Sequence, residues 1–134
     1  MVAMYNKNIL IGIFLSKANY TVSIQENKKF AIGYKVKPLI SIRGDISFLE
    51  AIHRSLKQHA VDSTIKELES KNNPRPILVI SGLININNII LLIPNLPDSG
   101  AKLEGFKHAL KIINEGQHKQ LKGLEALLEI KGVL

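Results

Sequence analysis

Residue types that catalyse reactions or bind metals are sparse in this chain of 134 residues. The three aspartates are Asp45, Asp62 and Asp98, and two of them stand at expected helix starts, where N-capping accounts for them. No serine has the context of a nucleophile elbow, and no glycine-rich phosphate loop is present. The histidines follow no metal-ligand spacing such as His-Glu-x-x-His and are expected at ordinary surface or interface positions: His53, His59, His108 and His118. The sequence therefore predicts no catalytic constellation, no bound metal and no cofactor.

Basic side chains are concentrated in the first half of the chain. Residues 1–75 hold 12 Lys and Arg against six Asp and Glu, a balance of +6, whereas residues 76–134 hold six against five. A one-sided basic excess indicates a polyanionic partner. A lysine-rich surface that only improves solubility explains the charge equally well.

Polar and basic side chains alternate with apolar ones along two expected hairpins, so they share one sheet face. On that face, lysines would neutralise phosphates, while Gln25 and Arg43 would reach base edges in the major groove, which admits a β-ribbon. The alternative is a solvated sheet face, which antiparallel sheets commonly have. Aromatic residues make up only 5% of the chain, which disfavours a single-strand binder. The candidate DNA-binding residues are Thr21, Ser23, Gln25, Lys28, Lys29, Lys35, Lys37, Ser41, Arg43, Lys66 and Arg75.

Hydrophobic periodicity predicts the elements that carry this face. An apolar helix capped by Asn6 or Asn8 runs straight into a strand near Ala18–Asn19. The expected strands are 20–27, 34–43, 63–68 and 75–81, and the expected helices are 8–17, 45–59, 84–93, 98–114 and 118–131. This order predicts an α+β fold with helices on one face of an antiparallel sheet.

Caps and core stripes are expected on the later helices. The second helix begins with a Ser47/Glu50 capping box or with Asp45 as N-cap, and Asp98 or Ser99 caps the fourth. Gly116 and Gly132 are expected to end the last two helices. The inward-facing residues are expected to be Leu49, Ile52 and Leu56, then Leu103, Phe106, Leu110 and Ile113, then Leu121, Leu124, Leu128 and Leu127.

Length and composition place the chain among globular proteins, with one domain over 1–134. The absence of cysteine excludes disulfides and fits a reducing compartment, so we expect the cytoplasm or an organellar matrix. Residues 76–97 are strongly apolar, but their prolines and asparagines indicate a buried strand and a short helix and not a membrane span.

One motif adds a family resemblance. Residues 10–18, LIGIFLSKA, resemble the LAGLIDADG motif of homing endonucleases, and the Thr21–Ile24 strand follows where that family places its first strand. Gly33-Tyr34 and Gly116-Gln117-His118 also resemble features of small family members. The resemblance implies the order α-β-β-α-β-β-α with an extra C-terminal helix.

The resemblance also implies a partner for the first helix. In the family two motif helices pack together, across a dimer or between two halves of one chain; one motif in this chain therefore implies a homodimer. Gly12 costs the helix about 1 kcal/mol relative to alanine, which indicates that another backbone comes close. The alternative is a core helix packed on its own sheet. The residues expected at the dimer helix are Leu10, Gly12, Ile13, Phe14 and Ser16.

The family's metal-binding acid is replaced here. It occupies the eighth motif position, which in this chain is Lys17, and the sixth position is Leu15. Neither supplies the oxygen ligands that Mg²⁺ requires. The resemblance implies a homodimer that binds double-stranded DNA without cleaving it, with Lys17 as a fixed cation near the phosphates. Two alternatives stay open: a Mg²⁺-dependent endonuclease whose acid comes from elsewhere or from a partner subunit, and a non-catalytic module that binds protein or, like a maturase, RNA.

Overall fold

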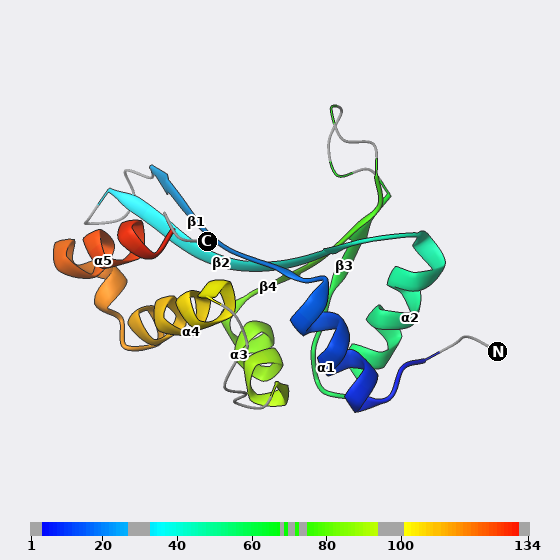
Figure 1. Ribbon diagram of the computed structural model, residues 1–134. Helices are drawn as coiled ribbons and strands as arrows, with labels where there is room; N and C mark the ends of the chain where they lie inside the picture. Colours follow the sequence, from blue (N-terminus) through cyan, green and yellow to red (C-terminus); the bar gives the residue numbers. More distant parts are fainter. Residues whose placement is uncertain are drawn as a thin grey trace. The chain divides into compact units, whose positions relative to one another are not determined.

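The computed structural model describes residues 4–26, 33–67, 69, 72, 75–93 and 101–131. Its elements, shown in Figure 1, are α1 (Lys7–Ser16), β1 (Asn19–Glu26), β2 (Tyr34–Arg43), α2 (Ile46–Lys57), β3 (Thr64–Lys66), β4 (Ile77–Ser81), α3 (Leu83–Leu92), α4 (Ala101–Asn114), the 3₁₀ turn η1 (Gln117–Lys119) and α5 (Leu121–Lys131). No helix in the described ranges combines the length and apolar composition that crossing a membrane requires.

The strands form one four-stranded antiparallel sheet in the order β1-β2-β4-β3. The β3–β4 hairpin pairs Thr64 with Val79 and Lys66 with Ile77. The α+β fold and the order of elements predicted from the sequence are confirmed, including the direct passage from α1 into β1.

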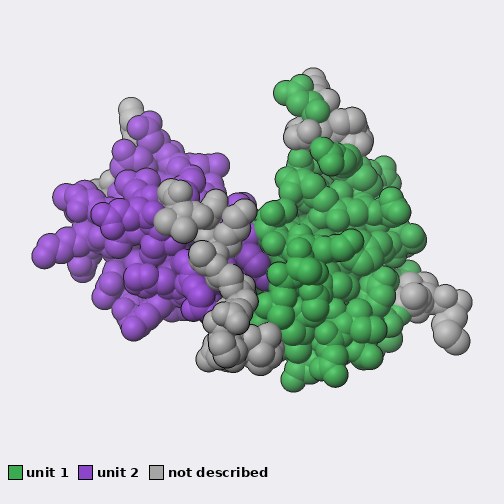
Figure 2. Space-filling model, viewed as in Figure 1, with its two compact units in different colours: residues 1–19, 40–94 green, residues 20–39, 95–134 purple. Residues whose placement is uncertain are grey.

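The chain divides into two compact units, coloured separately in Figure 2. Unit 1 comprises residues 1–19 and 40–94, and unit 2 comprises residues 20–39 and 95–134. The strand β2 begins in unit 2 and ends in unit 1. The single domain over 1–134 stays a prediction.

Unit 1 has a core of branched apolar side chains. The predicted stripe Leu49, Ile52 and Leu56 on α2 is buried, and α2 packs against β3 and β4. Leu78 and Ile80, on one face of β4, are also completely buried. Burial on this scale contributes about 1.5–3 kcal/mol for each such side chain, so α2 is one of the helices that support the strands in this unit.

Asparagines on α3 fasten the loop that precedes β3. The Asn85 side chain accepts a hydrogen bond from the Asp62 amide and donates one to the Ser81 carbonyl, both at 3.1 Å. The Asn88 amide donates to the carbonyl of Ala60, which has a positive φ of 59° just after α2. These bonds satisfy backbone groups that the turn leaves without helical partners.

Unit 2 is built around aromatic packing between a strand and a helix. The Tyr20 ring of β1 lies 5.2 Å from the Phe106 ring of α4, and burial raises the pKa of the Tyr20 hydroxyl. The predicted α4 stripe of Leu103, Phe106, Leu110 and Ile113 is buried. Gly116 stops the helix at a positive φ of 73°.

Of the two predicted starts of α2, the Asp45 cap is confirmed and the capping box is wrong; part of the predicted α5 stripe is also wrong. Asp45, whose backbone is extended, is the N-cap of α2, so Ser47 lies inside the helix and cannot begin a capping box. On α5, Leu121 and Leu128 are 66% and 51% exposed instead of buried, while Leu124 and Leu127 are buried as predicted. Helix α5 packs against η1, where Gly123 lies close to the Gln117 backbone, and against α4, and this packing turns Leu124 and Leu127 inward. The predicted caps Asp98 and Ser99, and Gly132, lie outside the described residues.

Candidate nucleic-acid interface

Helix α1 has two different faces. Its Asn6 side chain caps the helix by accepting a hydrogen bond from the Ile9 amide at 2.9 Å. Leu10, Ile13 and Phe14 are buried within the chain itself, which is what the alternative of a core helix predicts for these three residues. Gly12 and Ser16 are exposed on the other face. The five residues expected at a dimer helix therefore divide into three core residues and two surface residues.

The exposed face of α1 is open at Gly12. A Cβ atom built there meets no atom of the chain within 4 Å. Ile9, which lies one helical turn before Gly12, is 47% exposed. The Ser16 hydroxyl donates to the Gly12 carbonyl at 2.7 Å, which leaves this face apolar in character. No contact among the described residues accounts for a glycine at this position.

Lys17 occupies the end of α1. Its amide donates to the Ile13 carbonyl at 2.8 Å, and its Nζ lies 5.1 Å from the centre of the Phe48 ring, a cation–π distance. Phe48 in turn meets Tyr5 edge-on, with ring centres 6.1 Å apart. The Phe48 ring lies directly over Gly44, where a Cβ would stand 2.7 Å from its Cδ2 atom. These contacts fix the position of a positive charge at the foot of the helix.

A divalent metal does not fit this position. The ammonium of Lys17 repels a cation, whereas Mg²⁺ requires oxygen ligands. Among the residues that the structure describes, no group of three or more His, Asp or Glu side chains is arranged to hold a metal ion.

The candidate DNA-binding residues of unit 2 lie on the solvent side of β1 and β2. Thr21 and Gln25 are exposed and Ser23 is half-buried, while Val22 between them is buried. Lys35 and Lys37 are exposed, and Pro38 is buried. The predicted alternation is therefore confirmed in both strands. Lys28 and Lys29 lie outside the described residues.

The candidate DNA-binding residues of unit 1 differ from one another in exposure and in their partners. Lys66 and Arg75 are exposed, and Ser41 is half-buried. Arg43, the last residue of β2, forms an ion pair between its Nη2 atom and Oε1 of Glu69. Glu69 was not among the candidate residues predicted from the sequence. It precedes the turn between the expected strands 63–68 and 75–81, and local sequence does not define which side chain it meets.

Two of the histidines, His53 and His118, are influenced by residues close to them in the chain. His53 Nδ1 lies 2.6 Å from the Ser63 hydroxyl and links α2 to the segment before β3. Burial, followed by the nearby charge of Lys119, lowers the pKa of His118. Neither histidine is part of the basic strand face.

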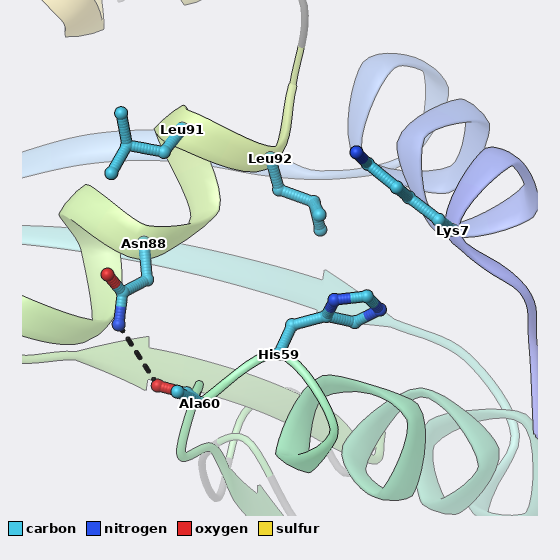
Figure 3. Close-up of a pocket in the computed structure, with 6 residues that line it drawn as sticks. All are labelled: Lys7, His59, Ala60, Asn88, Leu91 and Leu92. Carbon is cyan, nitrogen blue, oxygen red and sulfur yellow. Dashed lines mark hydrogen bonds between the residues drawn. The ribbon is translucent and has the colours of Figure 1, made fainter.

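A hollow of about 250 Å³ lies among the helices of unit 1. In Figure 3 the side chains of Lys7, His59 and Leu92 surround the same space, while Asn88 is bonded to Ala60. Leu91 completes the lining, and no strand residue contributes to it. The hollow is therefore separate from the candidate DNA-binding strands of this unit.

Comparison with known proteins shows a likeness of structure. Neither family models nor curated protein sequences give a match. Among solved structures, the homing endonuclease I-TnaI superposes with a TM-score of 0.81 at 19% identity, over 96% of this chain and 86% of that one. The LAGLIDADG meganuclease I-CpaMI, solved bound to uncleaved DNA, gives 0.75 at 26% identity. I-LtrWI, a LAGLIDADG homing endonuclease solved on its target DNA, gives 0.79 at 23% identity.

The chain therefore has the fold of the LAGLIDADG homing endonucleases, as the motif in α1 led us to expect. It spans most of I-TnaI but only 43% of I-CpaMI and 44% of I-LtrWI.

Proposed function

We propose that this chain binds double-stranded DNA through the polar face of its strands and does not cleave it. The observation that carries the proposal is the run of exposed polar and basic side chains on β1 and β2, above all Gln25, Lys35 and Lys37, whose neighbours Val22 and Pro38 are buried. The same fold in I-CpaMI and I-LtrWI was crystallised on DNA, which supports the proposal.

The loss of cleavage is proposed from Lys17. The side chain at the foot of α1 is a cation held over Phe48 and not a carboxylate. An ammonium at this position would attract a DNA phosphate while it excludes a metal ion. Lys17 then acts as a fixed cation that contributes to DNA binding, with no role in activating water.

We further propose that two copies associate through the exposed face of α1. Ile9, Gly12 and Ser16 form this face, and the space at Gly12 admits the backbone of a second helix. A symmetric dimer places the same surface on both copies. The chain covers 43% of I-CpaMI, and a second copy would supply a comparable second half.

The first test is incubation of supercoiled plasmid with Mg²⁺ or Mn²⁺, run beside a gel shift on the same DNA. We expect a shift without nicking. Nicking that a Lys17→Ala variant retained would instead support an endonuclease with its acid elsewhere or on a partner. A protein that neither binds nor nicks would favour the alternative of a protein-contact module, and binding only to RNA would favour the maturase-like alternative.

The salt dependence of binding gives a sharper prediction. Each phosphate contact contributes about 0.9 to the slope of log K against log salt. The double variant Lys35→Ala/Lys37→Ala should lower that slope by about 1.8 for each bound copy and weaken binding roughly tenfold or more near 0.1 M salt, measured by fluorescence anisotropy on a random 30-base-pair duplex. The control Lys111→Ala/Lys122→Ala removes the same charge from α4 and α5 and should leave the slope nearly unchanged; an equal effect of both variants would mean non-specific attraction by net charge.

A further inference from the structure

The ion pair between Arg43 and Glu69 separates this arginine from the other basic residues on the strands. Lys35, Lys37 and Lys66 are exposed, and the described part of the chain gives no ion pair for any of them. The pair of Arg43 with Glu69 has no net charge. A neutral pair releases few counterions when it meets DNA, so it is poorly suited to phosphate neutralisation.

Glu69 is itself held in place. Its side chain is only 17% exposed. Its backbone amide donates to the Arg75 carbonyl at 2.9 Å, which continues the pairing of the β3–β4 hairpin beyond Lys66. A carboxylate fixed by both backbone and burial restricts the rotamers of the arginine that it binds.

Arg43 keeps the ability to bind a second group. Its side chain is 42% exposed, and the ion pair with Glu69 joins its Nη2 atom to Oε1 of the carboxylate. A guanidinium carries five N–H donors in a planar fork, so donors remain for a bidentate contact. In the major groove, the acceptor pair that arginine matches in this way is O6 and N7 of guanine.

We propose that Glu69 holds Arg43 in the orientation in which its guanidinium reads a guanine edge, so that Arg43 supplies base preference and not phosphate neutralisation. Glu69 is then a positioning residue, and the ligand of the pair is a guanine in duplex DNA. This inference rests on the proposed DNA binding. The competing explanation is an ordinary surface ion pair, which contributes little to stability.

The test is selection of binding sites from a library of random duplexes, using the wild-type chain, Glu69→Gln, Arg43→Lys and the control Glu67→Gln. Glu67 is exposed in the same segment, so its variant removes an equal charge without touching the pair. We expect the wild-type chain to prefer guanine at one or more positions. Arg43→Lys and Glu69→Gln should reduce that preference about tenfold, because a good bidentate pair discriminates by roughly that factor or more. Glu67→Gln should keep it.

A salt titration on one random duplex provides the second readout. Arg43→Gln should leave the slope of log K against log salt unchanged, whereas Lys37→Ala should lower it by about 0.9 for each bound copy. A fall of the same size for Arg43→Gln would assign Arg43 to a phosphate and overturn the inference. Loss of guanine preference in Glu67→Gln, or its retention in Glu69→Gln, would also overturn it. Failure of the wild-type chain to bind any duplex would instead refute the proposed function itself.

Discussion

Helices α1 and α5 each contain a glycine, and the surroundings of the two glycines differ. At Gly123 in α5, a Cβ would stand 1.8 Å from the Gln117 carbonyl oxygen, which is much closer than a van der Waals contact allows. At Gly12 in α1, a Cβ would meet no atom of the chain within 4 Å. Both residues cost their helices about 1 kcal/mol relative to alanine. The cost at Gly123 is offset by packing within unit 2, whereas no contact among the described residues compensates for it at Gly12, which directs attention to a partner.

The largest effect should follow from closing the space at Gly123. Gly123→Ala forces a methyl group against the backbone of η1, which cannot move aside as a flexible side chain would. We expect a loss of about 3 kcal/mol in the free energy of unfolding, at the upper end of overpacking effects. Urea denaturation measures it. An unchanged midpoint would mean that α5 does not pack on η1 this closely.

A smaller effect, in association and not in folding, should follow from filling the space at Gly12. Gly12→Leu should weaken the dimer more than tenfold, since its side chain would keep the second helix away. Sedimentation velocity over a range of concentrations measures this.

The controls for Gly12 are Gly12→Ala and His108→Leu. Gly12→Ala should stabilise the dissociated chain by up to about 1 kcal/mol, the reverse of Gly123→Ala. His108→Leu adds the same side chain at an exposed position of α4 and should not change association. A wild-type chain that sediments as a monomer at all concentrations would contradict the dimer.

Gly44 provides an intermediate case. A Cβ there would stand 2.7 Å from Phe48 Cδ2, but the ring can turn, so Gly44→Ala should cost about 1 kcal/mol of unfolding free energy. Because Phe48 lies under Lys17, the displaced ring should also release the lysine. A lysine ¹⁵N or ¹³C chemical shift that moves in Gly44→Ala, but not in Gly12→Ala, would verify that contact.

Much of this fold follows from local patterns. The alternation along residues 34–43 predicted β2 with its bounds, and the stripe of α2 followed from its helical periodicity. Helical periodicity did not identify the buried face of a helix where two sets of leucines were equally regular. On α5, Leu121 and Leu128 fit a helical face as well as Leu124 and Leu127 do, and the packing of α5 against η1 and α4 decides between them.

The candidate site was predictable in its residue types but not in its pairings. The strand lysines could be placed on one face because a strand has a period of two residues. The Arg43–Glu69 pair depends on the position of the hairpin after β3, which local sequence did not define. The Lys17–Phe48 contact joins the end of one helix to the start of another, and a helical pattern carries no information about such a crossing.

The division of the chain between the two units has a consequence for protein synthesis. Unit 1 is complete once residue 94 has been made, but unit 2 needs residues 95–134 in addition to the earlier hairpin of residues 20–39. Until Phe106 arrives from the ribosome, the ring of Tyr20 lacks the helix that covers it. An uncovered apolar strand on a nascent chain is prone to aggregate. Slow translation between residues 40 and 106 should therefore reduce the soluble yield of this chain more than equally slow translation after α4.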